Sequence, residues 1–378
     1  MKIGITGQPG FIGTHLYNTL GLYPEKFTRI PFEDAYFDEE QKLNQWVQQC
    51  DVIVHLAAMN RHHDPAIIYE TNLRLVKQLI AACEKTGSCP HILFSSSSQE
   101  EKDNLYGKSK KEGRKLFEKW ADTNNAQFTG FIIPNVFGPF GNPYYNSVVA
   151  TFCHQLTHNE TPKIEIDGQV KLIYVGELVL QIIEHILEIK RNHPDDVVIE
   201  EICLQHTSET KVSTLLELLN RYKHDYFENG TIPSLDTSFN RNLFNTFLTY
   251  IDHPAFFPFH LKLNTDIRGS FVETIKLKSG GQVSFSTTVP GITRGNHFHT
   301  RKAERFAVIK GKARIDIRRI GTNKVLSFEM DGAKPSFVDM PIWYTHNITN
   351  IGKEELYTIF WINEFYNLYD SDTFFEKV

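Results

Sequence analysis

A tyrosine and a lysine four residues apart, Tyr106 and Lys110, have the types and spacing of a proton-transfer pair. On a helix the two side chains lie on one face, about one turn apart. A neighbouring ammonium favours the phenolate and brings the tyrosine nearer to acid–base work at neutral pH. The serine run Ser95–Ser98 precedes the pair and can share a substrate oxygen with it. Tyrosine–lysine pairs at this spacing are also common on helix surfaces, so the pair alone leaves a surface role open.

A glycine-rich turn at the start of the chain supplies the context that the pair needs. In residues 2–6, apolar and β-branched residues run straight into a glycine and predict a short buried strand, and residue 14 begins a helical pattern. A strand, a glycine turn and a helix start together form a cradle for a pyrophosphate. The residues predicted to form it are Gly7, Gly10, Phe11, Ile12 and Gly13. The alternative is a plain strand–helix turn with capping glycines.

Strands and helices alternate over the first half of the chain. Residues 51–58 predict a second buried strand, in which the small or apolar Leu56 and Ala57 let an adenine or ribose pack closely. A helix is expected to open at Thr71 and Asn72, and residues 92–94 form the strand that leads to the serines. This alternation predicts an α/β fold, a doubly wound parallel sheet with its site at the carboxyl ends of the strands.

Residues 212–222 predict an apolar helix, and beyond about residue 258 the chain predicts only short strands and turns, and hence a small all-β barrel. His297 and His299 are two apart on a strand and point to one face, Glu304 starts the next strand, and His346 arrives from another. Three imidazoles and a carboxylate suit a divalent ion, most simply zinc. The alternative is a set of buried histidines without metal.

Composition indicates a globular protein of two domains. The 378 residues carry a formal charge of -5 and are 41% hydrophobic, so neither nucleic acid nor an anionic membrane is an expected partner. The five cysteines have no paired spacing and suit a reducing compartment. With no apolar signal stretch at its start, the chain is expected to be cytoplasmic.

The G-x-x-G-x-x-G turn, the H-L-A-A element at residues 55–58 and the Y-x-x-x-K pair resemble the extended short-chain dehydrogenase/reductase family with a Rossmann fold. The resemblance implies that Tyr106 donates a proton, and that Lys110 binds the nicotinamide ribose and lowers the pKa of the tyrosine. It makes Ser97, the third residue of the serine run, the active hydroxyl, with Ser96 as the fallback. Related dehydratases carry Thr-Asp-Glu where this chain has Ser97-Ser98-Gln99, which favours plain hydride transfer.

Three further residues are assigned from this resemblance. Arg29 follows the second strand, where the family binds the ribose of NAD or the phosphate of NADP, and it favours NADPH. A surface arginine is the alternative. Asn135 and Asn146 are candidates for diphosphate or sugar contacts, and turn or helix caps are equally good interpretations.

The pattern H-x-H-x-x-x-x-E, the nearby Gly311 and the later P-x-x-x-x-H resemble the cupin family. Residues 266–273 and 294–297 resemble segments of cupins that epimerise deoxy-sugar nucleotides. The second segment carries the proton-abstracting histidine of those epimerases, yet a metal-bound His297 cannot also be the base. Arg268 or the metal is expected to stabilise an enolate, and Tyr344 is either an acid or structural.

Over nearly its whole length the chain resembles the CapF-type enzymes of bacterial capsular polysaccharide synthesis, through residues 145–153, 290–293, 295–297 and 344–348. The resemblance implies a reductase domain in residues 1–250 and a cupin domain in residues 251–378. The cupin would epimerise C3 of a UDP-linked 4-keto-6-deoxy-2-acetamido sugar, and the reductase would reduce C4 with NADPH. The product would be UDP-2-acetamido-2,6-dideoxy-L-talose, the precursor of L-fucosamine units.

Two rival functions stay open from the sequence. In the first, the protein is a single-function nucleotide-sugar 4-ketoreductase whose cupin binds sugar or holds a dimer together. In the second, it is a nucleotide-sensing regulator, although a sensor has no need of the proton donor Tyr106. Because relatives of both domains usually pair, a homodimer is expected.

Overall fold

The computed structural model describes residues 1–193, 196–267 and 269–378. By packing, the chain divides into two compact units. The first comprises Met1–Val148 and Gly168–Lys211, and the second comprises Val149–Asp167 and Val212–Val378. This division does not follow the predicted limits 1–250 and 251–378, because side chains that precede residue 250 bond to the C-terminal part of the chain. Tyr226 donates to Asp339 at 2.6 Å, and Asn245 donates to the Arg301 carbonyl at 3.1 Å.

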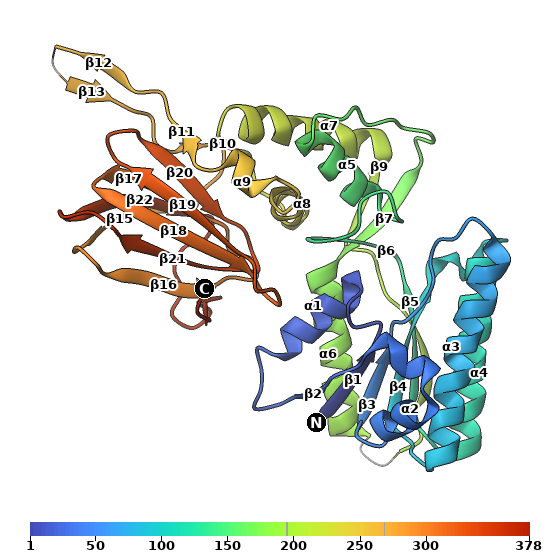
Figure 1. The fold of residues 1–378 in the computed structure, drawn as a ribbon. Coiled ribbons are helices and arrows are strands. Elements are labelled where there is room, and N and C mark those ends of the chain that lie inside the picture. Colours follow the sequence, from blue (N-terminus) through green and yellow to red (C-terminus); the bar gives the residue numbers. More distant parts are fainter. Residues whose placement is uncertain (194–195, 268) are drawn as a thin grey trace. The chain divides into compact units, whose positions relative to one another are not determined.

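The first unit is built on a six-stranded sheet in the order β2-β1-β3-β4-β5-β8 (Figure 1). Every neighbouring pair in it is parallel. Its strands are β1 (Lys2–Thr6), β2 (Thr28–Ile30), β3 (Val52–His55), β4 (His91–Ser97), β5 (Phe128–Ile133) and β8 (Ile199–Cys203). The strand order reverses between β1 and β3, and ligands of such sheets bind at this point, beyond the carboxyl ends. The predicted Rossmann-type α/β sheet is thus confirmed.

Helices cover both faces of this sheet (Figure 1). One face carries α2 (Glu40–Val47), α3 (Pro65–Thr86) and α4 (Leu105–Asn124), and the other carries α1 (Phe11–Leu20) and α6 (Val175–Asn192). Two short 3₁₀ turns, η1 (Asp34–Asp38) and η2 (Ser98–Glu101), follow β2 and β4. Burial on both faces explains why the strands are nearly continuous runs of apolar residues, as in β3, whose four residues are all buried.

The start of α3 differs from the prediction. The helix begins at Pro65, two turns before Thr71, because Asp64 caps it by accepting from the Ala66 amide at 2.9 Å. Proline at the first helical position and aspartate before it form a standard helix start. Asn72 therefore lies inside the helix, where its side chain accepts from the Met59 amide at 2.7 Å and ties the loop after β3 to α3.

A smaller sheet completes the first unit. It joins β6 (Asn135–Phe137), β7 (Gln169–Tyr174) and β9 (Ser208–Lys211), with β6 and β7 parallel and β7 and β9 antiparallel.

The second unit combines helices with two five-stranded antiparallel sheets, β11-β20-β17-β22-β15 and β19-β18-β21-β16-β23. Its helices are α5 (Val148–Thr157), α7 (Val212–Tyr222), the π-helical turn η3 (Lys223–Glu228), α8 (Ser238–Leu248) and α9 (His253–Phe256). The first sheet contains β11 (Phe259–His260), β15 (Gln282–Thr288), β17 (Glu304–Lys310), β20 (Ser336–Met340) and β22 (Leu356–Ile362). The second contains β16 (Thr293–Phe298), β18 (Lys312–Arg319), β19 (Val325–Asp331), β21 (Tyr344–Asn350) and β23 (Phe374–Phe375). The remaining strands are β10 (Thr231–Ile232), β12 (Asn264–Asp266), β13 (Gly269–Phe271) and β14 (Lys276–Leu277).

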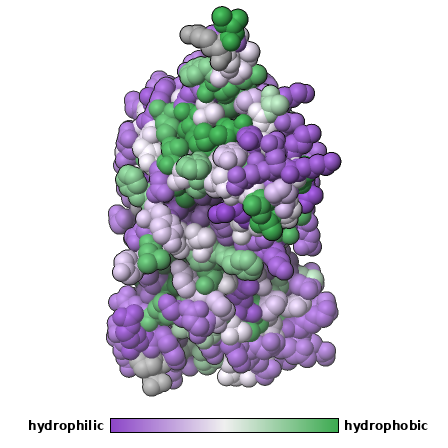
Figure 2. Space-filling view, turned by 90° about the vertical axis from the view of Figure 1, so that its left-hand side faces the viewer, coloured by the Kyte–Doolittle hydropathy of each residue, from purple (hydrophilic) through white to green (hydrophobic). Residues whose placement is uncertain are grey.

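The two sheets share one apolar core, to which Ile315, Phe337 and Ile348 contribute buried side chains. The predicted β-rich C-terminal part is confirmed, and its assignment as a cupin barrel stays a prediction. Exposed hydrophobic side chains of this unit include Phe271 and Phe285, and Figure 2 shows apolar patches within an otherwise hydrophilic face. Across the described ranges, no helix combines the length and the apolar character that crossing a membrane requires.

Candidate functional site

Two glycines of the turn between β1 and α1, Gly7 and Gly13, leave no room for a side chain. Gly7 has φ of +67°, and a Cβ there would lie 2.8 Å from the Ala57 nitrogen. A Cβ on Gly13 would lie 2.3 Å from the Gly7 oxygen, so α1 packs directly on the turn. The positive end of α1, at Phe11, therefore meets exposed backbone at the carboxyl end of β1. This cradle fits the pyrophosphate of a dinucleotide.

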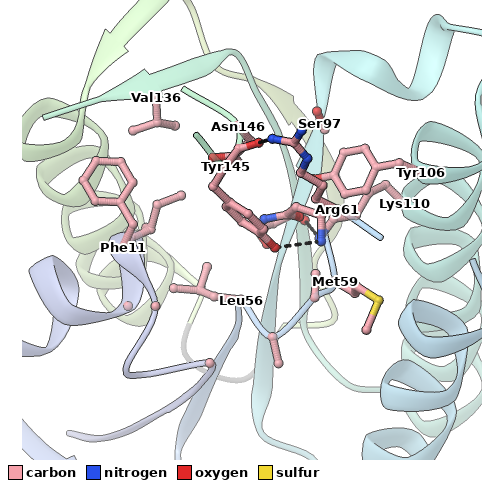
Figure 3. Close-up of a pocket in the computed structure, with 18 of the residues that line it drawn as sticks. Phe11, Leu56, Met59, Arg61, Ser97, Tyr106, Lys110, Val136, Tyr145 and Asn146 are labelled. Atoms are coloured by element: carbon pink, nitrogen blue, oxygen red, sulfur yellow. Dashed lines mark hydrogen bonds between the residues drawn. The ribbon is translucent and has the colours of Figure 1, made fainter. Parts of the chain in front are cut away.

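A cavity of about 750 Å³ opens at this edge of the sheet (Figure 3). Most of the residues predicted for coenzyme, substrate and catalysis line it. They are Gly7, Gly10, Phe11, Ile12, Gly13, Leu56, Ala57, Ser97, Tyr106, Lys110, Asn135 and Asn146. The structure thus brings together segments of the chain that are up to 139 residues apart in sequence, from Gly7 to Asn146.

Ser97 and Tyr106 both line this cavity. The Ser97 hydroxyl accepts from the Gln99 amide at 3.2 Å, and its interaction with the Tyr106 phenol favours the ionised form of that phenol. Ser96, the fallback, donates instead to the Glu100 carboxylate beneath the cavity. The geometry therefore favours Ser97 as the hydroxyl that reaches a substrate oxygen.

Lys110 is buried one turn further along α4 and is bound to the strand. Its ammonium donates to the Ser95 carbonyl at 2.8 Å and lies 5.9 Å from the centre of the Tyr106 ring. Burial lowers the pKa of Lys110 to about 8, and the negative charge of Glu100 opposes that shift. The lysine is therefore close to its protonation equilibrium at slightly alkaline pH.

The pKa of Tyr106 differs from the expectation. Burial raises it to about 12; the interaction with the Ser97 hydroxyl lowers it, and Tyr145 raises it further. The predicted lowering by the Lys110 ammonium is not among the causes of this shift, which the desolvation of the phenol dominates. Tyr106 consequently stays protonated across the physiological range, which is the form that a proton donor needs.

Arg29 does not line the cavity. It lies in β2 opposite Ile3, and its guanidinium stacks on the Tyr17 ring at 4.2 Å and donates to the Tyr17 carbonyl at 3.1 Å. The strand register turns this side chain toward α1, so its expected contact with a coenzyme phosphate has no support in the structure. Arg268, the other predicted arginine, lies outside the described residues.

Several lining residues were not predicted from the sequence. Arg61, in the loop after β3, donates to the carbonyls of Tyr144 and Tyr145, the latter at 3.1 Å (Figure 3). The Tyr145 hydroxyl accepts from the Asn60 amide at 3.3 Å. These bonds hold the loop before α5 over the cavity. The position of Arg61 just beyond a buried parallel strand is the signal that identifies it in retrospect.

Acidic and basic side chains of the first unit also reach the cavity where the coenzyme ribose is expected. Asp34 and Asp38 come from η1, and Arg74 comes from α3. Asn135 begins β6 and Asn146 precedes α5, and both their contact roles and their capping roles remain predictions.

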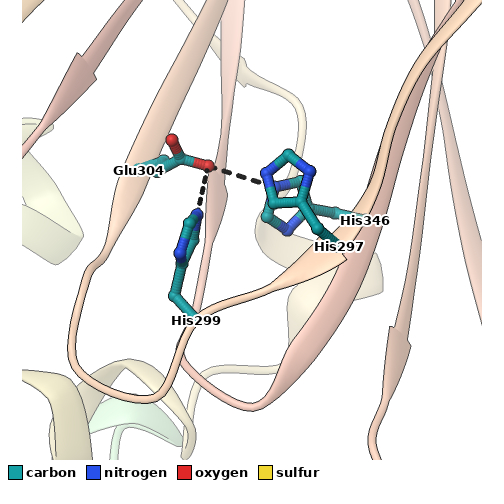
Figure 4. A group of neighbouring side chains, drawn as sticks. All are labelled: His297, His299, Glu304 and His346. Atoms are coloured by element: carbon teal, nitrogen blue, oxygen red, sulfur yellow. Dashed lines mark ion pairs between the residues drawn. The ribbon is translucent and has the colours of Figure 1, made fainter. Parts of the chain in front are cut away.

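The second unit brings the four predicted metal ligands together (Figure 4). One ligand atom from each of His297, His299, Glu304 and His346 lies within 4.8 Å of the others. The Glu304 carboxylate is 3.2 Å from His299 Nε2 and 3.0 Å from His346 Nε2. Apart from these mutual ion pairs, three buried atoms of the cluster have no hydrogen-bond partner among the described residues. They are Nε2 of His299, Oε2 of Glu304 and Nε2 of His346. Imidazole nitrogens without another partner, together with a carboxylate oxygen, are the ligands that a divalent ion such as zinc binds in proteins.

The imidazoles are oriented by the backbone. Nδ1 of His299 hydrogen-bonds the Asp372 carbonyl at 2.5 Å, and Nδ1 of His346 hydrogen-bonds the Tyr344 carbonyl at 3.2 Å. Each bond directs the opposite nitrogen, Nε2, at Glu304, as outer-shell partners do in metal sites. Burial and the neighbouring histidines lower the pKa of His297 to about 4, which keeps it neutral and able to bind a cation.

Two family models match the chain. The NAD dependent epimerase/dehydratase family matches residues 3–199, and the Polysaccharide biosynthesis C-terminal domain matches residues 264–374. The first match includes the glycine cradle and the serine, tyrosine and lysine set, and the second includes the histidine–glutamate cluster.

Relatives cover the whole chain. A UDP-2-acetamido-2,6-beta-L-arabino-hexul-4-ose reductase from Pseudomonas aeruginosa is 30% identical over 99% of this chain and 98% of its own. The crystal structure of the capsular polysaccharide assembling protein CapF from Staphylococcus aureus is 32% identical, covers 100% of both chains and has a TM-score of 0.60. The structure of RMD from Pseudomonas aeruginosa with NADPH is 20% identical over 59% of this chain and 82% of its own, with a TM-score of 0.51, and supports the fold alone.

The glycine cradle and the position of Arg29 predict opposite results for two substitutions. Gly13→Ala places a Cβ against the Gly7 oxygen, so we expect it to weaken NADPH binding by about tenfold or more. Arg29→Ala removes a side chain held by Tyr17, so we expect a change below about threefold. Titration followed by coenzyme fluorescence measures both. A large loss in Arg29→Ala would restore that arginine to the coenzyme site.

The histidine cluster predicts stoichiometric metal that depends on its imidazoles. We expect His297→Ala to lose most of the zinc that the purified protein carries, because three ligands in place of four bind more weakly. Elemental analysis measures the content, and the exposed His260→Ala in β11 is the control. Equal metal content in both variants contradicts the ligand set.

Proposed function

The chain belongs to the NAD dependent epimerase/dehydratase family and, over its full length, to the CapF type of capsular polysaccharide proteins, and on this premise we propose that it is a nucleotide-sugar 4-ketoreductase. Its substrate is a UDP-linked 4-keto-6-deoxy-2-acetamido sugar, and its reductant is NADPH. The reaction class named for the Pseudomonas aeruginosa relative supports this choice.

One observation carries the proposal. Ser97, Tyr106 and Lys110 converge on a cavity that begins at the glycine cradle. A nucleotide-binding protein without catalysis needs the cradle, but it has no use for a protonated phenol beside a serine hydroxyl. The convergence favours catalysis over a sensing role.

In the proposed reduction, Ser97 and Tyr106 act on the C4 carbonyl oxygen. Both hydroxyls donate hydrogen bonds to that oxygen, which become stronger as negative charge develops on it. The Tyr106 phenol then transfers its proton to the oxygen. An alkoxide is more basic than a phenolate, so this transfer is favourable even with the pKa of Tyr106 raised to about 12.

Lys110 holds the nicotinamide ribose and keeps a positive charge near the tyrosine that loses its proton. A bound reduced nicotinamide supplies the hydride to C4. The glycine cradle and the first turn of α1 hold the pyrophosphate, and Leu56 and Ala57 line the adenosine side. NADPH is proposed from the CapF-type resemblance, and Arg29 adds no support for it.

We further propose that the C-terminal part epimerises C3 before the reduction. The hydrogen on C3 is next to the C4 ketone, so removing it gives an enolate whose oxygen needs stabilisation. His297, His299, Glu304 and His346 would hold a zinc ion, whose chemistry in the site is to polarise that oxygen. A histidine that binds the metal is not the base, and the base is a different group. The product is then UDP-2-acetamido-2,6-dideoxy-L-talose.

The alternative is a single-function reductase in which the metal cluster only stabilises the C-terminal sheets. The burial of three of the four ligand residues favours this reading of the metal, because structural sites are closed while catalytic sites keep an open position.

Removal of the phenolic proton donor tests the reductase half. We expect Tyr106→Phe to lower the rate of coenzyme oxidation with the 4-keto sugar by about 10²-fold or more, with coenzyme affinity retained. Tyr69→Phe is the matched control. The Tyr69 hydroxyl, on α3, donates to Glu112 on the exposed surface of α4, which is the helix that carries Tyr106. A Tyr106→Phe variant with the full rate would exclude the assignment.

Isotope exchange tests the epimerase half separately. In deuterium oxide without any coenzyme, we expect the protein to exchange the C3 hydrogen of the 4-keto sugar, as followed by NMR. His297→Ala should abolish this exchange while leaving reduction of a pre-epimerised substrate intact. No exchange by the intact protein supports the single-function alternative.

A further inference from the structure

Glu100 is a buried carboxylate directly beneath the catalytic hydroxyls. It lies in η2, three residues after Ser97, and its side chain is only 5% exposed. The described residues that line the cavity include Ser97 and Gln99 from this segment but not Glu100. It is therefore not placed to touch substrate or coenzyme, yet it keeps a full charge out of water. Such a charge persists only where its partners compensate it well.

Arg114 is that partner, and it makes a two-pronged contact. Its Nε donates to Oε1 of Glu100 at 3.0 Å and its Nη2 donates to Oε2 at 2.8 Å. The Ser96 hydroxyl also donates to Oε1. A bidentate arginine–carboxylate pair fixes both distance and orientation. The turn η2 is thereby fastened to helix α4.

Arg114 belongs to the same stripe of α4 as the catalytic pair. It follows Lys110 by four residues and Tyr106 by eight, so all three face the sheet. Its side chain crosses β5 at Gly130, where a Cβ would lie 2.6 Å from its Cδ. Its Nη1 continues to Glu118 at 2.6 Å and to Glu201 on β8 at 2.5 Å.

The turn η2 and the helix α4 are in close contact at Gly107, with no space for a side chain between them. A Cβ on Gly107, next to Tyr106, would lie 2.0 Å from the Gln99 carbonyl oxygen. The Gln99 amide in turn donates to the Ser97 hydroxyl at 3.2 Å. Because Gln99 touches α4 next to Tyr106 and also holds Ser97, a small displacement of η2 moves Ser97 relative to Tyr106.

We propose that Glu100, through Arg114, is the positioning residue that sets the distance between Ser97 and the Tyr106–Lys110 pair. This inference rests on the proposed reductase function for its kinetic consequence. Its effect on the protonation of Lys110 can be measured through the pH dependence of coenzyme binding, without any sugar substrate.

A pH profile distinguishes this role from simple stabilisation. The titratable groups facing Lys110 are Glu100 from η2, His55 from β3 and Tyr106 from its own helix. Burial lowers the pKa of His55 to about 3, so it is neutral, and the Tyr106 phenol is neutral as well. Glu100 supplies the negative charge that holds the pKa of Lys110 up against burial. Without that charge the ammonium loses its proton at lower pH.

The test is Glu100→Gln, which keeps the size of the side chain and removes its charge. NADPH binding is followed by coenzyme fluorescence as the pH rises. We expect the pH at which binding is half lost to be lower in Glu100→Gln than in the unmodified protein, by about half a unit or more. We expect kcat for the 4-keto sugar to fall by about tenfold, because the hydroxyls are misplaced. Glu118→Gln is the matched control: it binds the same arginine but is 31% exposed, and it should change neither measurement.

A Glu100→Gln variant with the unmodified pH profile and kcat overturns the inference. If that variant does not fold, the double variant Glu100→Gln with Arg114→Gln carries the kinetic test: it removes the two-pronged contact and both of its charges, and kcat should again fall by about tenfold. If the intact protein reduces no nucleotide-linked ketone while the NADPH binding profile still shifts, the proposed function fails and the positioning of Lys110 by Glu100 stands.

Discussion

The hydrogen bond from the Lys110 ammonium to the Ser95 carbonyl, at 2.8 Å, is the constraint on which the reducing site depends. It fastens α4 to the carboxyl end of β4, whose last three residues are Ser95, Ser96 and Ser97. With that register fixed, Tyr106 one turn earlier lines the same cavity as Ser97, and Arg114 one turn later binds Glu100. One stripe of a single helix thus carries the proton donor, the coenzyme lysine and the arginine that holds the next turn in place.

Burial gives this stripe its chemical character. The same desolvation that raises the pKa of Tyr106 to about 12 lowers that of Lys110 to about 8. The phenol is kept as an acid, while the lysine is close to losing its charge and depends on a neighbouring carboxylate to retain it. In the second unit, too, the surroundings set the chemistry of the side chains. Backbone carbonyls orient the imidazoles of His299 and His346 and leave the Nε2 atom of each directed at Glu304.

Much of the first site was predictable because it depends on local rules. Only glycine fits at Gly7 and Gly13, and a spacing of four places Tyr106 and Lys110 on one helix face. The His-x-His pair was predictable for the same reason, from the alternation of side chains along a strand. Residue types at fixed short spacings are information that a sequence contains directly.

The remainder depends on contacts between distant segments, which spacing alone does not reveal. Arg29 was assigned to the coenzyme, but the register of β2 against β1 turns it toward Tyr17. The Tyr106 pKa was expected to fall, but the depth of burial decides its direction. The pairing of Glu100 with Arg114, 14 residues later on α4, likewise follows from the packing of η2 against that helix and not from spacing.

The central claim, that this cavity delivers hydride to C4 of a keto sugar, is tested most directly by following the hydride itself. The protein would be incubated with a UDP-linked 4-keto-6-deoxy-2-acetamido sugar and NADPH deuterated at the transferable position of C4 of the nicotinamide, and the product analysed by NMR. The account predicts one deuterium on the sugar C4, with a single configuration at that carbon. Coenzyme that stays reduced, or a product without deuterium at C4, would contradict it.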